Sequence, residues 1–132
     1  RFRNHSADDF SKHADRLPIR KHFYQDMSKN GFDGELLTRA LEKLRQTCER
    51  IAAAVAETGG PWIFGASFSL ADIIVIPLIA RLDDIGYRTL WDDLPATAAW
   101  LDAAKARPSW AATFYPGAPI SERYPGAFTA AA

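Results

Sequence analysis

The sequence predicts an all-α fold, and three observations support that prediction. Residues 69–84 are apolar on almost every side and follow an explicit helix start. Residues 34–57 repeat apolar side chains at intervals of three and four, as one stripe of an amphipathic helix does. No segment alternates apolar and polar residues as a half-buried strand would. We therefore expect about five or six helices, wrapped around a central buried helix at 69–84.

The predicted central helix begins with a capping box. Ser69 stands at the N-cap, and Asp72 lies three residues later, where its carboxylate can reach back to the N–H of Ser69. Phe68 and Ile73 have the spacing of a hydrophobic staple. A short helix that is apolar all round is typical of a buried element. We interpret Ser69 and Asp72 as a structural cap rather than a catalytic pair, and we expect the whole helix to be buried.

Start and stop signals before this helix predict three more helices. Ser6 and Asp9 belong to a second possible capping box, which opens a short helix to about Asp15. Pro18 suits the first turn of a helix that runs from residue 19 to about residue 29, with Asn30 and Gly31 as its stop. Asp33 can then cap the long helix at 34–57, which residues 58–61 end with strong breakers.

The region after the central helix is predicted to be helical up to residue 114. Pro77 should kink the central helix. Residues 87–93 are expected to form a short turn or helical piece, Pro95 opens another helix that ends near Arg107, and one further turn covers 109–114. The tail carries several prolines and glycines. We therefore expect one helical domain at 1–115 and an irregular tail at 116–132.

The length and composition are typical of an ordinary globular protein with one domain. The chain has 132 residues, of which 48% are hydrophobic and 24% charged. Its 16 basic and 16 acidic residues cancel, so we expect neither nucleic acid nor a membrane as partner. The longest apolar run is too short to span a bilayer, and no signal peptide is evident. A single cysteine excludes an internal disulfide and fits a reducing compartment, and we expect a cytoplasmic protein.

An ordered set of motifs resembles the C-terminal helical domain of glutathione S-transferases. Trp-Ile-Phe-Gly at 62–65 leads into Phe-Ser-Leu-Ala-Asp-Ile at 68–73, and Pro77 follows a turn later. After a short spacer come Leu94-Pro95, Trp100 and Arg107-Pro108. The resemblance covers roughly residues 30–115. The layout of residues 17–32 and the long helix after them looks like a bacterial branch near the β-etherases, which use glutathione to cleave aryl ethers from lignin.

The resemblance implies a parent enzyme that conjugates or uses glutathione on hydrophobic electrophiles, as a homodimer. In that family an N-terminal thioredoxin-like domain supplies the catalytic residue and most glutathione contacts. Nothing in this chain resembles its βαβ pattern, and the chain opens without an initiator Met, as a segment of a longer protein would. We therefore expect no catalytic residue here and an inactive isolated chain. The alternative is a non-catalytic interaction module, such as the related helical domains appended to translation factors and synthetases.

Four aromatic residues are candidates for the electrophile pocket that the resemblance implies between the two domains. They are Phe2, Tyr24, Phe114 and Tyr115. The alternative is that they are ordinary core or surface aromatics. The four tryptophans are more simply explained as core anchors. The family resemblance supports that role most strongly for Trp100.

Other reactive residue types have ordinary explanations. Cys48 lies within the apolar stripe, so we expect a buried small hydrophobe rather than a nucleophile. His5, His13 and His22 lack the i, i+4 spacing of a helical metal pair, so we expect surface histidines and no metal site. Adjacent carboxylates point in different directions on a helix, so we interpret the pairs at 83–84 and 92–93 as helix-end or turn residues.

Overall fold

The computed structural model describes residues 6, 8–9, 12, 15–30 and 34–126, and it confirms the predicted all-α class. The chain divides into two compact units, residues 1–41 and 42–132. We describe each unit by itself. The helices described from end to end are η1 (Pro18–Arg20), α2 (Lys21–Asn30), α3 (Gly34–Thr58), α4 (Leu70–Asp84), η2 (Arg88–Leu90), α5 (Pro95–Lys105), α6 (Pro108–Thr113) and α7 (Ile120–Arg123). Residues 8, 9, 12 and 15 are also helical.

In the described part of the first unit, the two predicted helix starts at Ser6 and Pro18 are present. Ser6 N donates to the Asp9 carboxylate at 3.1 Å and Asp9 N donates to Ser6 Oγ at 3.2 Å, which is the reciprocal pattern of a capping box. Pro18 opens η1, which leads directly into α2. The predicted stop at Gly31 and the predicted cap Asp33 lie outside the described residues.

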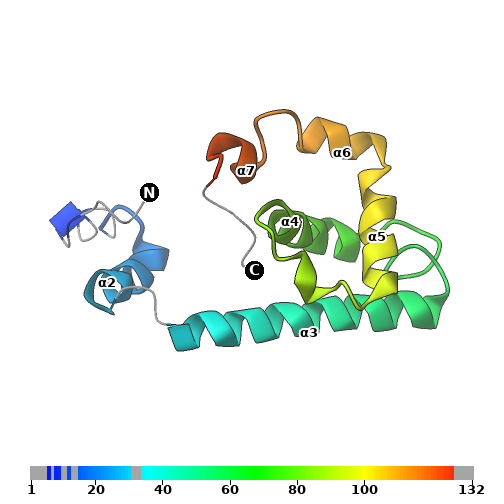
Figure 1. Cartoon of the computed structure of the whole chain (residues 1–132), viewed down its shortest axis with the longest axis horizontal. Coiled ribbons are helices and arrows are strands. Elements are labelled where there is room, and N and C mark those ends of the chain that lie inside the picture. The colour runs from blue at the N-terminus through cyan, green and yellow to red at the C-terminus, as the bar shows by residue number, and fades with distance from the viewer. Residues whose placement is uncertain (1–5, 7, 10–11, 13–14, 31–33, 127–132) are drawn as a thin grey trace. The chain divides into compact units, whose positions relative to one another are not determined.

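The core of the second unit lies between α3, α4 and α5. Figure 1 shows α3 along one side, with α4 and α5 packed over it and α6 and α7 on the far side of α4. Trp91 and Trp100 are fully buried, as expected of core anchors. The buried cluster comprises Cys48, Ile51, Trp62, Ile76, Ile79, Leu82, Trp91, Trp100, Leu101 and Ala104.

The burial of α4 corrects one expectation. Its side with Ile76 and Ile79 is buried as predicted. Its other side is exposed, although we expected the whole helix to be buried. Helix periodicity places these exposed positions on one face, because they recur at intervals of three and four. We call this face the α4 stripe; it consists of Leu70 (69% exposed), Ile73 (52%), Ile74 (68%) and Leu78 (41%).

A tight turn at residues 59–65 joins α3 to the segment before α4. Trp62 and Gly65 exchange backbone hydrogen bonds of 3.1 and 3.0 Å. The backbone of Gly65 passes so close to Gly60 that a Cβ on Gly60 would overlap it. Gly65 itself has φ of +89°, a conformation that favours glycine. The breakers that we expected to end the long helix therefore also build a close backbone crossing.

Polar contacts tie α3 to the segments that follow α4. The Arg45 guanidinium binds both carboxylate oxygens of Asp93 and also donates to the carbonyl of Leu90 at 3.2 Å. This hydrogen bonding holds the pKa of Asp93 below its usual value. Buried Thr97 donates to the backbone carbonyl of Cys48 at 2.7 Å, which connects α5 to the middle of α3.

The tail is more ordered than we expected. We predicted irregular structure after residue 115, but Ile120–Arg123 form one turn of helix, α7. Local hydrogen bonds precede it, because Ala118 N donates to the carbonyl of Tyr115 at 2.9 Å and Gly117 N donates to Glu122 at 2.6 Å. The boundary of the helical domain at residue 115 stays a prediction.

Candidate functional site

A cavity of about 250 Å³ lies between the C-terminal end of α4, α6 and the tail. One wall is apolar and comes from Ala80, Trp110 and Phe114. The tail provides further lining residues. The remaining lining residues are Arg81, Asp83, Asp84, Ala118, Pro119, Ser121 and Glu122. The mixture of an apolar surface with a few convergent polar groups is typical of small-molecule sites.

The apolar wall is a pair of aromatic rings. The rings of Trp110 and Phe114 lie 4.2 Å apart and are tilted by 32°. They share a helix face because they are four residues apart. Both are half-buried, and both pack against the core cluster. A flat aromatic molecule in the cavity would therefore meet ring surfaces that the core holds in place.

Arg107 fixes the start of α6, on which this pair depends. Its guanidinium lies 3.7 Å from the ring centre of Phe68 and 5.4 Å from that of Trp62. The two rings also contact each other edge to face at 4.8 Å. These contacts attach the beginning of α6 to the segment before α4 through cation–π interactions.

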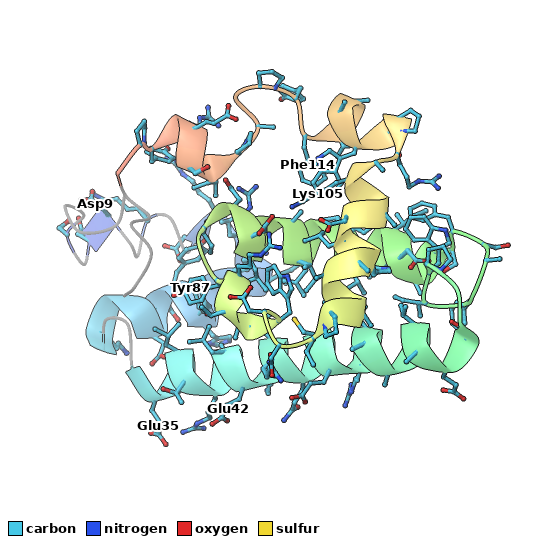
Figure 2. All side chains as sticks on the ribbon, turned by 45° about the vertical axis from the view of Figure 1, so that its right-hand side comes forward. Asp9, Glu35, Glu42, Tyr87, Lys105 and Phe114 are labelled. Atoms are coloured by element: carbon cyan, nitrogen blue, oxygen red, sulfur yellow. The ribbon has the colours of Figure 1, made fainter. Side chains whose placement is uncertain are left out.

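Charged groups at the end of α4 are paired with one another. Lys105 Nζ lies 2.6 Å from the Asp83 carboxylate, and Arg88 lies 3.8 Å from the same group. Figure 2 shows Lys105 and Phe114 near each other above α4. Arg81 binds Asp84 at 2.8 Å. Of the three carboxylates at the cavity, those of Asp83 and Asp84 face cations, whereas that of Glu122 accepts a hydrogen bond from Gly117 N.

Asp84 also binds the tail. Its carboxylate accepts from Ile120 N at 2.7 Å, from Ser121 N at 3.3 Å and from the Ser121 hydroxyl. Burial alone would raise the pKa of Asp84, but these hydrogen bonds, together with the positive charge of Arg81, hold it below its usual value. Asp84 is therefore ionised at neutral pH, and its hydrogen bonds to the tail are charge-assisted.

The predicted capping box of Ser69 and Asp72 is formed, at the opposite end of α4 from the cavity. Both halves of the capping box are present, and Asp72 accepts from Ser69 N at 2.9 Å and from Ser69 Oγ at 2.6 Å. Asp72 also accepts from Ile63 N at 3.1 Å and from Trp100 Nε1 at 2.8 Å. The carboxylate is fully buried. All of its described partners belong to the fold itself, so it has no free position for a substrate.

Two of the four predicted pocket residues lie in the described part of the second unit, and one of these, Phe114, lines the cavity. The other, Tyr115, is 59% exposed and is not part of the lining. Tyr24 is buried in the first unit, where it contacts Phe23 edge to face. Phe2 lies outside the described residues. The assignment of all four to substrate binding stays a prediction.

Nine of the ten cavity residues were not recognised from the sequence as site residues, among them Trp110, Asp84 and Ser121. Trp110 was explained only as a core anchor, and Asp84 only as a helix-end residue. Ser121 gave no signal, because its partner Asp84 lies 37 residues away. The spacing of Trp110 and Phe114 on one short helix was the one usable signal for this cavity.

The other reactive side chains lie where ordinary structural roles place them. Cys48 is fully buried, and burial raises the pKa of its thiol, which disfavours the reactive thiolate. His22 is exposed, and His5 and His13 lie outside the described residues. Within the described ranges, no three His, Cys, Asp or Glu side chains gather as metal ligands. None of the described helices combines the length and apolarity needed to cross a membrane.

Comparisons with known proteins identify the family of this chain. The profile of the glutathione S-transferase C-terminal domain matches residues 34–103. Two curated relatives, from two strains of Sphingobium indicum, are named 2,5-dichlorohydroquinone reductive dechlorinase. Each is 33% identical over 88 residues, which cover 63% of this chain and 25% of the relative. The chain thus spans about a quarter of the length of the relatives it matches.

No solved structure matches the chain. The comparisons do not test the resemblance to the β-etherase branch, which stays a prediction. The profile match extends from the start of α3 into α5, and so includes the capping box and the central helix. Because it covers more than half of the 132 residues, this chain belongs to the glutathione S-transferase family, and residues 34–103 correspond to the C-terminal domain of that family.

Proposed function

We propose that this chain is the helical domain of an enzyme that uses glutathione on hydrophobic, electrophilic aromatic compounds, and that its cavity holds the aromatic co-substrate. Family membership supports the glutathione-dependent chemistry. The observation that carries the assignment of the cavity is its wall of Trp110 and Phe114. An apolar cavity of about 150 Å³ accommodates benzene, so a cavity of about 250 Å³ has room for one substituted ring.

The names of the relatives support a halogenated ring as the substrate class. A dichlorohydroquinone is a single aromatic ring with two hydroxyl and two chlorine substituents, and it fits a small cavity with an aromatic wall and a polar rim. We propose a compound of this size and kind for the present chain. Glutathione is proposed as the co-substrate, and the parent protein is proposed to be a cytoplasmic homodimer, as the family resemblance implies.

The catalytic residue and most glutathione contacts are proposed to lie outside these 132 residues. Among the described residues, the single cysteine is fully buried, and the Ser69–Asp72 pair is occupied by the fold. Neither can present a nucleophile or stabilise a glutathione thiolate at the cavity. This division of labour gives the helical chain the apolar half of the active site.

The isolated chain is therefore expected to be inactive. We predict that the purified 132-residue protein will not accelerate the reaction of glutathione with a chlorodinitrobenzene, because the residue that activates the thiol is proposed to lie outside it. The measurement is the initial rate of conjugate formation by absorbance, compared with a reaction without protein. A rate that rises in proportion to protein concentration would contradict the proposed division of labour.

The cavity can be tested by binding a chlorinated hydroquinone to the isolated chain under reducing conditions. Phe114→Ala is expected to weaken binding by about tenfold, because it removes half of the aromatic wall. The measurement is the dissociation constant from isothermal titration calorimetry. Thermal unfolding of the variant is recorded in parallel, because Phe114 also packs against the core.

Tyr115→Ala is the matched control for this experiment. It removes the neighbouring aromatic ring, which is exposed and does not line the cavity. Its dissociation constant is expected to stay within twofold of the unmodified chain. Equal weakening by both substitutions, or by neither, would mean that the ring of Phe114 does not form the binding wall.

The α4 stripe favours a second candidate function, a non-catalytic interaction module. Four large apolar side chains exposed on one helix face, at residues 70, 73, 74 and 78, are a typical protein-contact surface. The coding sequence upstream of this chain distinguishes the two candidates. A thioredoxin-like domain in the same gene supports the enzyme, and a gene without one supports the module.

A further inference from the structure

The carboxylates that line the cavity differ in how completely the fold already uses them. Both oxygens of Asp84 accept hydrogen bonds, from Arg81 and from the segment at residues 120–121. Asp83 faces two cations, Lys105 at 2.6 Å and Arg88 at 3.8 Å. A ligand that bound either of these two carboxylates would therefore have to displace a partner that the protein supplies.

Glu122 is the exception among the lining carboxylates. One of its oxygens, Oε2, accepts from Gly117 N at 2.6 Å, which holds the side chain in place at the cavity. Within the described residues, its second oxygen, Oε1, accepts no hydrogen bond, and no cation pairs with the carboxylate. Glu122 is also exposed. It therefore offers a ligand one open acceptor that carries a negative charge.

The lining as a whole is unfavourable to an anion. Of its ten described residues, three are carboxylates and one is a cation. That cation, Arg81, is already bound to Asp84 at 2.8 Å. Cations outside the lining offset the charge of Asp83. The charge that remains uncompensated at the cavity is therefore negative and belongs to Glu122.

The carboxylate of Glu122 determines which ring substituent suits it. An ionised carboxylate accepts hydrogen bonds and donates none. An unionised ring hydroxyl is a donor, so it can occupy the open oxygen in a charge-assisted hydrogen bond. After loss of its proton the same ring is an anion without a donor, and it would lie beside a like charge. The two forms differ by one proton, so their apolar contacts with the aromatic wall are the same.

We propose that the cavity selects a hydroxylated aromatic ring in its unionised form, and that Glu122 is the specificity-determining residue, which accepts the O–H of the ring and repels the phenolate. The contact of the ring with Trp110 and Phe114 rests on the proposed function. The selection against the anion rests on the contacts of the lining carboxylates. Chlorine substituents withdraw electrons and promote ionisation of a ring hydroxyl, so this selection applies directly to the chlorinated hydroquinones proposed above.

Binding of a chlorinated phenol to the full 132-residue chain, measured by isothermal titration calorimetry at several pH values, tests the selection. The phenol is chosen to ionise between about pH 6 and pH 9, where carboxylate, ammonium and guanidinium groups generally keep their charges. The described lining contains no histidine or cysteine. The unionised phenol is expected to bind at least about tenfold more tightly than the phenolate. A dichlorodimethoxybenzene, which cannot ionise, is expected to bind equally at every pH.

Glu122→Gln separates the effect of this residue from the general cost of placing an anion in an apolar cavity. The amide keeps an oxygen for Gly117 N and removes the charge. It is expected to lower the preference for the unionised phenol at least about threefold, and Glu122→Lys is expected to lower it further. Glu57→Gln is the matched control, because it makes the same change of charge at an exposed residue of α3 that does not line the cavity. It is expected to leave the preference unchanged.

The outcomes distinguish this selection from the proposed function. Equal affinity for the phenol and its phenolate, or a preference that Glu122→Gln and Glu57→Gln change to the same extent, would overturn the selection and leave the cavity as an aromatic site. Failure of the dimethoxy compound to bind the unmodified chain, or binding that Phe114→Ala does not weaken, would overturn the cavity as an aromatic site and the selection with it.

Discussion

Replacement of Asp72 by alanine is expected to lower the free energy of unfolding by about 4 kcal/mol. Loss of an N-cap alone typically costs about 1 kcal/mol. Asp72 does more than cap α4, because it is fully buried and also accepts hydrogen bonds from Ile63 N and Trp100 Nε1. Alanine would leave these donors without a partner, at about 1–3 kcal/mol for each buried group. Urea denaturation of the isolated chain measures the difference.

Ser69→Ala is the matched control, because it removes one hydroxyl contact with the same carboxylate and leaves the other donors satisfied. We expect it to cost about 1 kcal/mol. Trp100→Phe should fall between the two variants, since it keeps most of the packing and loses one donor. If Asp72→Ala were no worse than Ser69→Ala, the contacts with Ile63 and Trp100 would contribute nothing to stability.

The same carboxylate predicts a dependence of stability on pH. Burial alone would raise the pKa of Asp72, but its four hydrogen bonds hold it below the usual value. A folded-state pKa below the unfolded one means that the stabilisation is fully present above the unfolded pKa of about 3.9 and is lost as pH falls through the folded pKa. When the pH falls from about 5 to about 3, the free energy of unfolding should therefore decrease less in Asp72→Asn than in the unmodified chain. Urea denaturation of both chains at each pH measures this difference.

The second large effect is expected at Gly60. A Cβ there would overlap the backbone of Gly65, which cannot move away without breaking the paired hydrogen bonds between Trp62 and Gly65. The same turn presents Ile63 N to Asp72. We predict that Gly60→Ala lowers the free energy of unfolding by about 3 kcal/mol, as overpacking against a backbone does. The midpoint of thermal or urea unfolding reports this change.

Gly59→Ala provides the comparison for Gly60. Gly59 has a positive φ of +67°, but nothing lies within 4 Å of the place where its Cβ would stand. Gly59→Ala is therefore expected to lower the free energy of unfolding by about 1 kcal/mol, because alanine is strained at a positive φ. A larger loss at Gly59 than at Gly60 would show that the close crossing of residues 60 and 65 is not maintained in solution.

The sequence predicted those features that depend on neighbouring residues. The start of α4 is set by Ser69 and Asp72, three residues apart, and the cap was correct because both partners share one turn. The reach of Asp72 to Trp100, 28 residues further on, depends on how α5 packs over α4. No local sequence pattern predicts a contact between residues so far apart. The sequence therefore underestimated how much Asp72 contributes to stability.

The α4 stripe shows a second limit of sequence patterns. The helix is apolar on all sides, which correctly predicted a central element but wrongly predicted burial of every face. A pattern of hydrophobicity says that a face favours burial and does not say which segment covers it. The described residues cover the face with Ile76 and Ile79 and leave the face with Ile73 and Ile74 exposed.

The candidate site was predictable only in part. Phe114 was identified through the family resemblance, and it does line the cavity. Tyr115 was identified through the same resemblance, but adjacent residues at the end of a helix point in different directions, and it lies exposed. The contact of Asp84 with Ser121 depends on the path of a tail that we expected to be irregular.

Binding of a small chlorinated aromatic compound in the cavity can be followed by nuclear magnetic resonance, in a titration of the isotope-labelled chain. The largest chemical-shift changes are expected on residues 80–84, 110–114 and 118–122, which surround the cavity. The α4 stripe at residues 70–78 should change little. Shifts concentrated on that stripe, or none around the cavity at saturating ligand, would contradict the claim that this cavity is the aromatic half of the active site.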